Sequence, residues 1–456
     1  MAGEQWADIK LSEIIDVKHG FAFPGENIRE KPPGDVLLTP GNFAIGGGFK
    51  GDKYKYFDGQ VPEEYVLHEN DLIVTMTDLS KQADTLGYPA LVPKPQHFRY
   101  LHNQRLGKVL IRDGAKVDKR FISYLLRTPE YRHEILASAT GTTVKHTSPS
   151  RILAFKTSIP PLPEQCAIAH ILGTLDDKIE LNRRMNDALE AMARTLHKSW
   201  FVDFDPVRAK AEGRDPGLPK PLANLFPDSF EDSDLGEIPK GWKVDVLEKA
   251  LVELEVGGRP KGGVSGYTEG VPSIGAESIV DLGIFDFSKT KYVPREFFDR
   301  MTKGHVKSRD VLLYKDGGRP GEYEPHVTMF GDGFPFSTCA INEHVYRLRA
   351  KAELGQNFLF FSLSSDLLME EMRIKGTGVA IPGLNSTQVK SLTTLNPPRE
   401  TIRAFDAIVE PWIARLLASC NESRTLAELR DTLLPKLISG ELRVKDGERV
   451  CERVGA

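Results

Sequence analysis

Cysteine is scarce in this chain, with four residues among 456. They are scattered, and no two of them have the spacing of a metal-ligand pair, so neither a disulfide framework nor a metal site is expected. No apolar run reaches the roughly 18 residues that cross a bilayer, and the first residues lack the basic and then apolar pattern of a signal peptide. We therefore expect a cytoplasmic protein without membrane contact.

A basic excess is also missing, because the formal net charge is −4. Surfaces that follow DNA phosphates are usually basic, so composition alone makes DNA binding a minority interpretation. The sequence also lacks the phosphate-binding G-x-x-x-x-G-K-S/T loop, the G-x-S-x-G elbow and the H-E-x-x-H zinc helix. We therefore expect no cofactor and no enzymatic activity in this chain.

An adenine methyltransferase needs an Asn/Asp-Pro-Pro-aromatic tetrapeptide, whose ring stacks on the extruded base. Asn396-Pro-Pro-Arg399 comes close, but arginine stands where the ring belongs. It also lies at a predicted helix start, so we interpret it as a domain border.

At 456 residues the chain is long enough for two or three domains. A repeat with a period of roughly 235 to 240 residues spans most of it. Six short matches keep both their order and their spacing, which predicts a duplicated α/β domain. The matches pair Trp6 with Trp242, Asp71 with Asp310, Asn103-Gln104 with Asn342-Glu343, the helical segment at Phe121 with that at Phe358, Gly141 with Gly376, and Pro160-Pro161 with Pro397-Pro398.

Between these matches the two halves differ. The segment 46–56 has only a loose counterpart in 257–263. A shared scaffold with divergent loops is expected when each copy must recognise something different.

Each Pro-Pro pair is followed by a seven-residue apolar repeat, which predicts two long helices that pair as an antiparallel coiled coil. The first, from 164 to 200, would be roughly 55 Å long. Ordinary core packing in a bundle is the alternative, but Asn182 and Asn186 favour a seam in which polar residues set the register. The predicted seam comprises Leu172, Leu175, Ile179, Asn182, Asn186 and Leu189 on the first helix, and Trp412, Leu416, Ser419, Ser423 and Leu426 on the second.

The segment after the first helix combines large aromatic and acidic side chains and precedes a proline-rich stretch, 215–221. Trp200, Phe201 and Phe204 are therefore predicted to form an exposed surface that binds a partner protein. The alternative is that they cap the helix pair internally.

The predicted fold class is α+β, with two similar α/β domains of approximate two-fold symmetry separated by the antiparallel helix pair. The expected boundaries are 1–160 for the first domain, 161–205 for the central helix, 206–240 for a linker, 241–397 for the second domain, 398–442 for the distal helix and 443–456 for a tail.

Three motifs stand at the borders of the helices: Ile159-Pro-Pro-Leu-Pro-Glu-Gln165, Lys198-Ser-Trp-Phe-Val-Asp-Phe204 and Leu434-Pro-Lys-Leu-Ile-Ser-Gly-Glu-Leu442. With the repeat, they make the chain resemble the specificity subunit of type I restriction-modification systems over nearly its full length. The second copy departs from this pattern, since Asn396-Pro-Pro-Arg-Glu400 lacks the leucine and glutamine of the first.

The resemblance implies two target-recognition domains, each of which reads one half of a split double-stranded DNA target. It implies that the helices fix the unread gap and hold two methyltransferase subunits. The complex would methylate adenine with S-adenosylmethionine and, with added restriction (motor) subunits, cleave unmodified DNA. This chain would carry neither reaction.

DNA binding requires basic groups for phosphates, and amide or guanidinium groups that reach base edges. In the first domain, candidates of these kinds and two interleaved tyrosines lie on three segments: Lys50, Lys53, Tyr54, Lys55, Tyr56, Lys81, Gln82, Thr142, Thr143, Lys145 and His146. By repeat position, the second domain offers Arg259, Lys261, Lys315, Arg319, Lys375 and Thr377.

Two other function classes remain open. A duplicated-domain adaptor would bind protein without DNA specificity, and a stand-alone modification enzyme would itself bind S-adenosylmethionine.

Overall fold

The computed structural model describes residues 6–51, 53–80, 82–95, 97–378 and 381–444. The chain divides into two compact units. Unit 1 runs to Asp177 and resumes at Leu426, and unit 2 runs from Lys178 to Thr425. Within the described residues, no helix is both long and apolar enough to span a membrane.

Unit 1 is built on a four-stranded antiparallel sheet, in the order β2-β11-β7-β9, and a five-stranded sheet, in the order β3-β5-β4-β10-β6. In the second sheet β4 and β10 are parallel. The strands of the first sheet are β2 (Ile15–His19), β11 (Leu106–Ile111), β7 (Leu72–Thr75) and β9 (Pro89–Leu91). Those of the second are β3 (Ile28–Arg29), β5 (Lys55–Phe57), β4 (Asp35–Leu38), β10 (Tyr100–His102) and β6 (Val66–Leu67).

Shorter elements complete unit 1. Strand β1 (Ala7–Lys10) pairs with β13 (Lys156–Ile159), and β8 (Thr77–Asp78) pairs with β12 (Lys145–His146). The short helices are α1 (Leu11–Ile14), α2 (Lys119–Leu125), α3 (Pro129–Ser138) and α4 (Pro149–Leu153).

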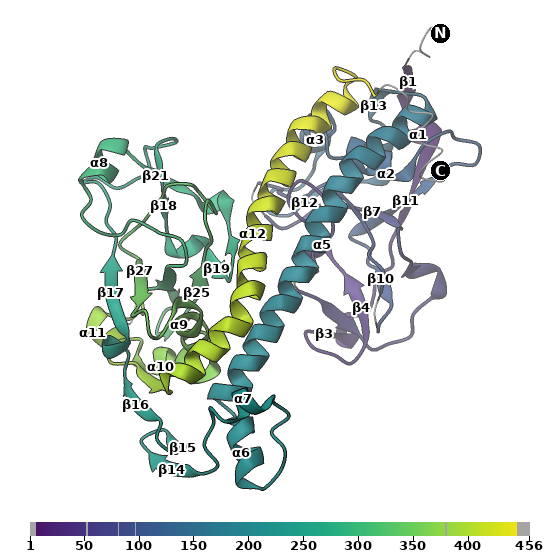
Figure 1. Cartoon of the computed structure of the whole chain (residues 1–456). Helices are drawn as coiled ribbons and strands as arrows, with labels where there is room; N and C mark the ends of the chain where they lie inside the picture. Colours follow the sequence, from purple (N-terminus) through teal and green to yellow (C-terminus); the bar gives the residue numbers. More distant parts are fainter. Residues whose placement is uncertain (1–5, 52, 81, 96, 379–380, 445–456) are drawn as a thin grey trace. The chain divides into compact units, whose positions relative to one another are not determined.

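Unit 2 repeats this plan (Figure 1, teal and green). Its four-stranded sheet has the order β17-β27-β22-β25, and its three-stranded sheet, β21-β18-β26, again contains a parallel pair, β18 with β26. These strands are β17 (Leu251–Val256), β27 (Val345–Ala350), β22 (Val311–Tyr314), β25 (Val327–Met329), β21 (Lys291–Val293), β18 (Val271–Ile274) and β26 (Ala340–Ile341).

The remaining elements of unit 2 include the pair β16 (Lys243–Val246) with β28 (Thr393–Asn396), which corresponds to β1 with β13. Three short hairpins are β14 (Phe230–Ser233) with β15 (Gly236–Pro239), β19 (Ile279–Asp281) with β20 (Ile284–Phe285), and β23 (Gly318–Arg319) with β24 (Glu322–Tyr323). The short helices are α6 (Asp205–Ala211), α7 (Lys220–Ala223), α8 (Arg295–Arg300), α9 (Gln356–Leu363), α10 (Asp366–Lys375) and α11 (Ser386–Lys390).

Local backbone features confirm the predicted duplication. Asn70 and Arg309 precede the matched aspartates and both have positive φ, 64° and 66°, an unusual conformation for residues other than glycine. The carboxylates of Asp71 and Asp310 then accept the backbone N–H three residues earlier, at 2.8 and 2.7 Å. The same strained turn therefore opens β7 and β22.

One sequence correspondence is wrong. Gly257 follows β17, which occupies the place of β2, so its counterpart is Gly20 and not Gly46. A Cβ on Gly20 would lie 2.1 Å from the carbonyl oxygen of Asn103, and one on Gly257 would lie 1.7 Å from that of Ile341. Both glycines allow the same close backbone approach.

The two long helices are confirmed as α5 (Leu162–Phe201) and α12 (Arg399–Ile438), and each begins directly after its second proline. Their pairing is antiparallel inside each unit. In unit 1, Asp176 on α5 forms an ion pair with Arg430 on α12 at 2.7 Å. In unit 2, the amide of Asn182 donates to Glu422 at 3.0 Å and to Ser423 at 3.2 Å.

The predicted polar residues of the seam do meet: the hydroxyl of Ser419 also donates to the amide oxygen of Asn186. Leu172, Asn182, Leu416 and Ser419 are buried, whereas the other predicted seam residues are partly exposed. The helices also contribute to the domain cores. Phe405, Val409 and Ile413 of α12 are fully buried with α9 in unit 2, and Leu434, Leu437 and Ile438 join the core of unit 1.

Candidate nucleic-acid interface

In unit 2, the loops that carry the candidate residues meet at one edge of the four-stranded sheet, where β17 and β22 end and β27 begins. Backbone bonds tie them together. Lys315 donates its N–H to His344 at 2.9 Å and accepts the N–H of Leu384 at 2.8 Å. Gly383 in turn pairs with both Asp316 and Thr377.

Charged groups link the same loops. Arg259 forms an ion pair with Glu343 at 2.8 Å, and the Nδ1 atom of His344 lies 2.6 Å from Asp316. The ammonium of Lys315 donates to the backbone carbonyl of Glu343 at 3.2 Å. The structure thus brings Arg259, Lys315 and Thr377 to one edge, with Lys261 and Arg319 exposed on two of its loops.

The hydroxyl of Tyr346 anchors the loop that ends at Leu384, whose carbonyl it donates to at 3.0 Å. Burial raises the pKa of Tyr346 to about 12. The hydroxyl therefore stays protonated and keeps this bond at any physiological pH.

Lys375 has a different environment. It is the last residue of α10, and its ammonium donates to the carbonyl of Ser391 at 2.7 Å and forms an ion pair with Glu371 at 2.7 Å. These contacts hold the end of the helix and make Lys375 the weakest candidate of the set.

In unit 1, the pairing of β8 with β12 sets Lys145 opposite Asp78 and His146 opposite Thr77. The Nδ1 atom of His146 lies 3.2 Å from the hydroxyl of Thr77. Thr142, Thr143 and Gln82 are exposed nearby in the chain, and Lys81 lies outside the described residues.

Asp78 organises the loop that contains Gln82. Its carboxylate accepts the backbone N–H groups of Ser80 at 2.6 Å and Thr85 at 2.5 Å, and the Thr85 hydroxyl at 2.7 Å. Burial acts to raise the pKa of Asp78, but the hydrogen bonds from Thr85 and Ser80 outweigh it and hold the pKa below its ordinary value. The loop is therefore closed around a charged carboxylate.

The remaining candidates of unit 1 lie on the segment before and within β5. The amide of Asn42 donates to the carbonyls of Lys50 and Lys53, at 3.3 and 2.8 Å. Gly48 donates to Pro89, the first residue of β9, at 2.8 Å, which brings this loop to the four-stranded sheet.

The three lysines of this segment, Lys50, Lys53 and Lys55, are exposed, and Lys55 pairs with Glu30 at 3.4 Å. The interleaved Tyr54 and Tyr56 are half-buried and pack against the core of the five-stranded sheet. They support the loop, and the lysines are its outward-facing groups.

The prediction of an exposed aromatic surface at the end of α5 is wrong. Trp200, Phe201 and Phe204 are only 2%, 6% and 8% exposed and belong to the main core of unit 2, with Trp242 and Phe405. Three large aromatic rings in a short segment are equally typical of a buried core and of an exposed docking surface. Here the alternative, that these rings pack internally, is correct.

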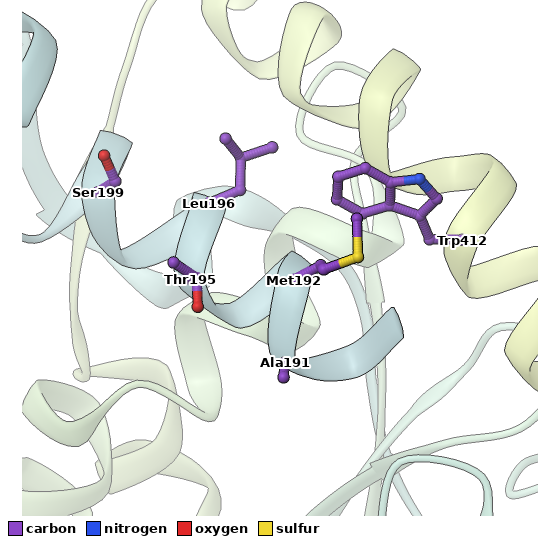
Figure 2. Close-up of a pocket in the computed structure, with 6 residues that line it drawn as sticks. All are labelled: Ala191, Met192, Thr195, Leu196, Ser199 and Trp412. Atoms are coloured by element: carbon purple, nitrogen blue, oxygen red, sulfur yellow. The ribbon is translucent and has the colours of Figure 1, made fainter. Parts of the chain in front are cut away.

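An apolar groove lies nearby on the helices of unit 2. Its volume is about 490 Å³, and Figure 2 shows Met192 and Trp412 side by side in its wall. Met192 is 48% exposed. The other lining residues are Ala191, Thr195, Leu196 and Ser199.

Among the described residues, no group of three or more His, Cys, Asp or Glu side chains could hold a metal ion. The described loops at this edge carry basic, amide and hydroxyl groups together with carboxylates, some of which are ion-paired. The edge can recognise a polar or anionic surface.

Two copies of one domain plan that differ in their loops can each recognise something different. Residues 3–191 match the family described as "Type I restriction modification DNA specificity domain". The EcoBI specificity subunit of Escherichia coli is 31% identical, over 96% of this chain and 86% of that protein. The MjaIX specificity subunit of Methanocaldococcus jannaschii is 24% identical, over 97% of this chain and 95% of its own length.

Among solved structures, the S subunit of a type I restriction-modification system from M. genitalium has the same fold. The TM-score is 0.56 at 16% identity, and the match covers 96% of this chain and 97% of that one. The chain belongs to the family of type I restriction enzyme specificity subunits. This confirms the resemblance predicted from the sequence, and with it a non-catalytic specificity subunit in preference to a protein-binding adaptor.

Proposed function

We propose that this chain is the cytoplasmic DNA-reading subunit of a type I restriction-modification complex, in which each recognition domain reads one half of a bipartite double-stranded target. We assign these domains to 1–160 and 241–397. One observation carries the proposal. The same sheet edge occurs in both copies, and its exposed polar and basic side chains differ between them.

The surroundings of each candidate residue indicate whether it suits a phosphate contact or a base contact. Exposed lysines such as Lys53 and Lys55 suit phosphates, which need a positive charge but no fixed geometry. Arg259 is held by an ion pair, and a positioned guanidinium suits a base edge. Arg319, Gln82, Thr142 and the remaining loop candidates complete the two surfaces.

Charge reversal tests the modular assignment. The double variant Lys53→Glu and Lys55→Glu should weaken contacts at the first half-site, and Arg319→Glu those at the second. Lys351→Glu is the control, because Lys351 is exposed after the end of β27, at the opposite edge of that sheet.

The measurement is binding of the chain with its methyltransferase partner to a random-sequence DNA library, followed by sequencing of the bound fraction. Each lost phosphate contact should also reduce the slope of log affinity against log salt by about 0.9. Equal losses at both half-sites would contradict modular reading. A wild-type complex that selects no sequence would instead favour the protein-binding adaptor.

We place the docking of two methyltransferase subunits, to which restriction subunits add in the full complex, on the long helices. The groove beside Met192 and Trp412 supports this, since it leaves apolar surface of both helices uncovered. Met192→Glu should reduce co-purification of the methyltransferase. Leu136→Glu, a comparable change at a 39% exposed leucine on α3, should not.

A further inference from the structure

The turn that leads into β11 in unit 1 and into β27 in unit 2 has the same construction in both units. In unit 1 it joins β10 to β11 through Asn103, and the two residues at its tip are Gln104 and Arg105. In unit 2 it joins β26 to β27 through Asn342, and its tip residues are Glu343 and His344. We call each of these two-residue segments the tip.

Side-chain capping fixes both tips. The side-chain oxygen of Asn103 accepts the N–H of Arg105 at 2.9 Å, and that of Asn342 accepts the N–H of His344 at 2.9 Å. Gly20 and Gly257 each approach the turn so closely that no Cβ fits. The backbone of each tip is therefore held in place from two sides.

The tip also adjoins the candidate loops. In unit 1, Met76 donates its N–H to Arg105 at 2.8 Å and accepts the N–H of Thr147 at 3.0 Å, which places the tip beside the strand that carries Lys145 and His146. Lys315 makes the equivalent two bonds in unit 2. Each tip thus lies inside the proposed DNA-binding edge.

The side chains on this common turn are different. Gln104 and Arg105 are exposed, and within the described residues neither side chain has a hydrogen bond or ion pair. Glu343 and His344 are half-buried and engaged. Glu343 lies 2.8 Å from Arg259, which is itself 59% exposed.

Recognition of a base edge requires an arginine or amide side chain at a fixed position, and the two tips provide such positions. Arginine can bond to both O6 and N7 of guanine, and glutamine to both N6 and N7 of adenine, when the side chain is presented at a defined place. A short turn that is held by side-chain and backbone bonds supplies that place better than a long exposed lysine side chain. An ion pair to a carboxylate restricts a guanidinium in the same way.

We propose that the tip is the specificity-determining element of each recognition domain. In the first domain Gln104 and Arg105 contact base edges directly, with a purine as the partner of each. In the second domain Glu343 is a positioning residue that aims Arg259 at a guanine. The proposal rests on the proposed function and names the residues that read sequence within it.

The test is methylation-site sequencing of host DNA with the chain and its methyltransferase expressed together. Arg105→Ala should reduce discrimination roughly 10- to 100-fold at one base of the first half-site and leave the second unchanged. The control is Arg112→Ala, which removes a half-exposed arginine just past the other end of β11. It should leave both half-sites intact.

In the second domain, Arg259→Ala and Glu343→Gln should relax the same single base, and the double variant should lose no more than Arg259→Ala alone. A merely structural role for Glu343 would weaken methylation without changing the preferred sequence. Glu353→Gln, an exposed glutamate after the other end of β27, is the control.

The outcomes separate the two proposals. If the wild-type complex shows no sequence preference, the proposed function fails. If it methylates a bipartite site and the tip variants keep every base preference, or lose both half-sites equally, the tip proposal is overturned and the DNA-reading function stands. Thermal unfolding of each variant distinguishes lost reading from lost folding.

Discussion

Replacing Asp310 with alanine would remove the centre of an ion-pair network in the four-stranded sheet of unit 2. The Asp310 side chain is fully buried, and its carboxylate lies 3.0 Å from Arg347 and 2.6 Å from Arg349. Arg347 is 3% exposed and also pairs with Glu253 and Glu255. The repeat offers a matched comparison, because Asp71 occupies the same turn in unit 1.

The expected loss in the free energy of unfolding depends on how deeply each ion pair is buried. Removing one partner of a buried ion pair destabilises a protein by about 3 to 5 kcal/mol. Asp71 and its partner Lys108 are 15% and 20% exposed, so water partly screens them. Loss of that pair and of the turn bond should cost roughly 1 to 2 kcal/mol.

A second variant divides the effect. Asp310→Asn retains an oxygen that can accept the N–H of Lys307, which the native carboxylate binds at 2.7 Å, but it removes the charge. It should therefore recover only the part of the loss that comes from the turn bond, about 1 kcal/mol.

Hydrogen exchange resolved by mass spectrometry is the suitable assay, because it reports the opening free energy of each unit separately. Asp310→Ala should accelerate exchange in β22 and β27 but not in β7 and β11, and Asp71→Ala should do the reverse to a smaller extent. Equal or opposite magnitudes would refute the argument from burial.

Three further changes have defined outcomes. Burial raises the pKa of Asp406 to about 6, above the ~3.9 of an unfolded chain, so the folded state binds a proton more readily and stability falls as pH rises from about 4 to 6. Asp406→Asn should therefore stabilise unit 2 by roughly 3 kcal/mol at pH 7.5, with a gain in thermal stability that shrinks toward pH 4. Trp200→Ala should destabilise unit 2 by about 3 to 5 kcal/mol in denaturant unfolding, as a core substitution does; a stable variant that only loses a partner would contradict its burial. Gly20→Ala should displace the turn at Asn103 and impair methylation of the first half-site alone, and unchanged methylation would show that the turn tolerates the shift.

Periodic and positional signals made much of the fold predictable. The heptads that flank Asn182 and Ser419 identify two paired helices, because residues that face a partner helix recur every three or four positions along its length. The matched Asp71 and Asp310 identify the duplication, since each closes a turn whose geometry depends on that carboxylate.

Other features depend on contacts that a sequence pattern does not carry. The aromatic character of Trp200 and Phe201 is the same on a surface and in a core. Their packing against the distant rings of Phe226, Trp242 and Phe405 decides between the two. Gln104 and Glu343 were recognised in the sequence only as matching positions of the repeat. Their place at the sheet edge depends on the fold, so the sequence pattern did not identify them as candidate DNA contacts. Lys375 was predicted to contact DNA because the sequence does not show that the fold brings Ser391 next to it. The carbonyl of Ser391 accepts a hydrogen bond from the Lys375 ammonium.

The core of unit 1 is completed by residues from distant parts of the chain. Leu434, Leu437 and Ile438 pack with Leu11 and Leu172, although a ribosome adds them only after all of unit 2 has been synthesised. Because domains fold as their residues emerge, unit 2 has its whole sequence available before unit 1 does. A chain that stops before Leu434 would therefore leave the core of unit 1 incomplete and its apolar residues open to chaperones and proteases.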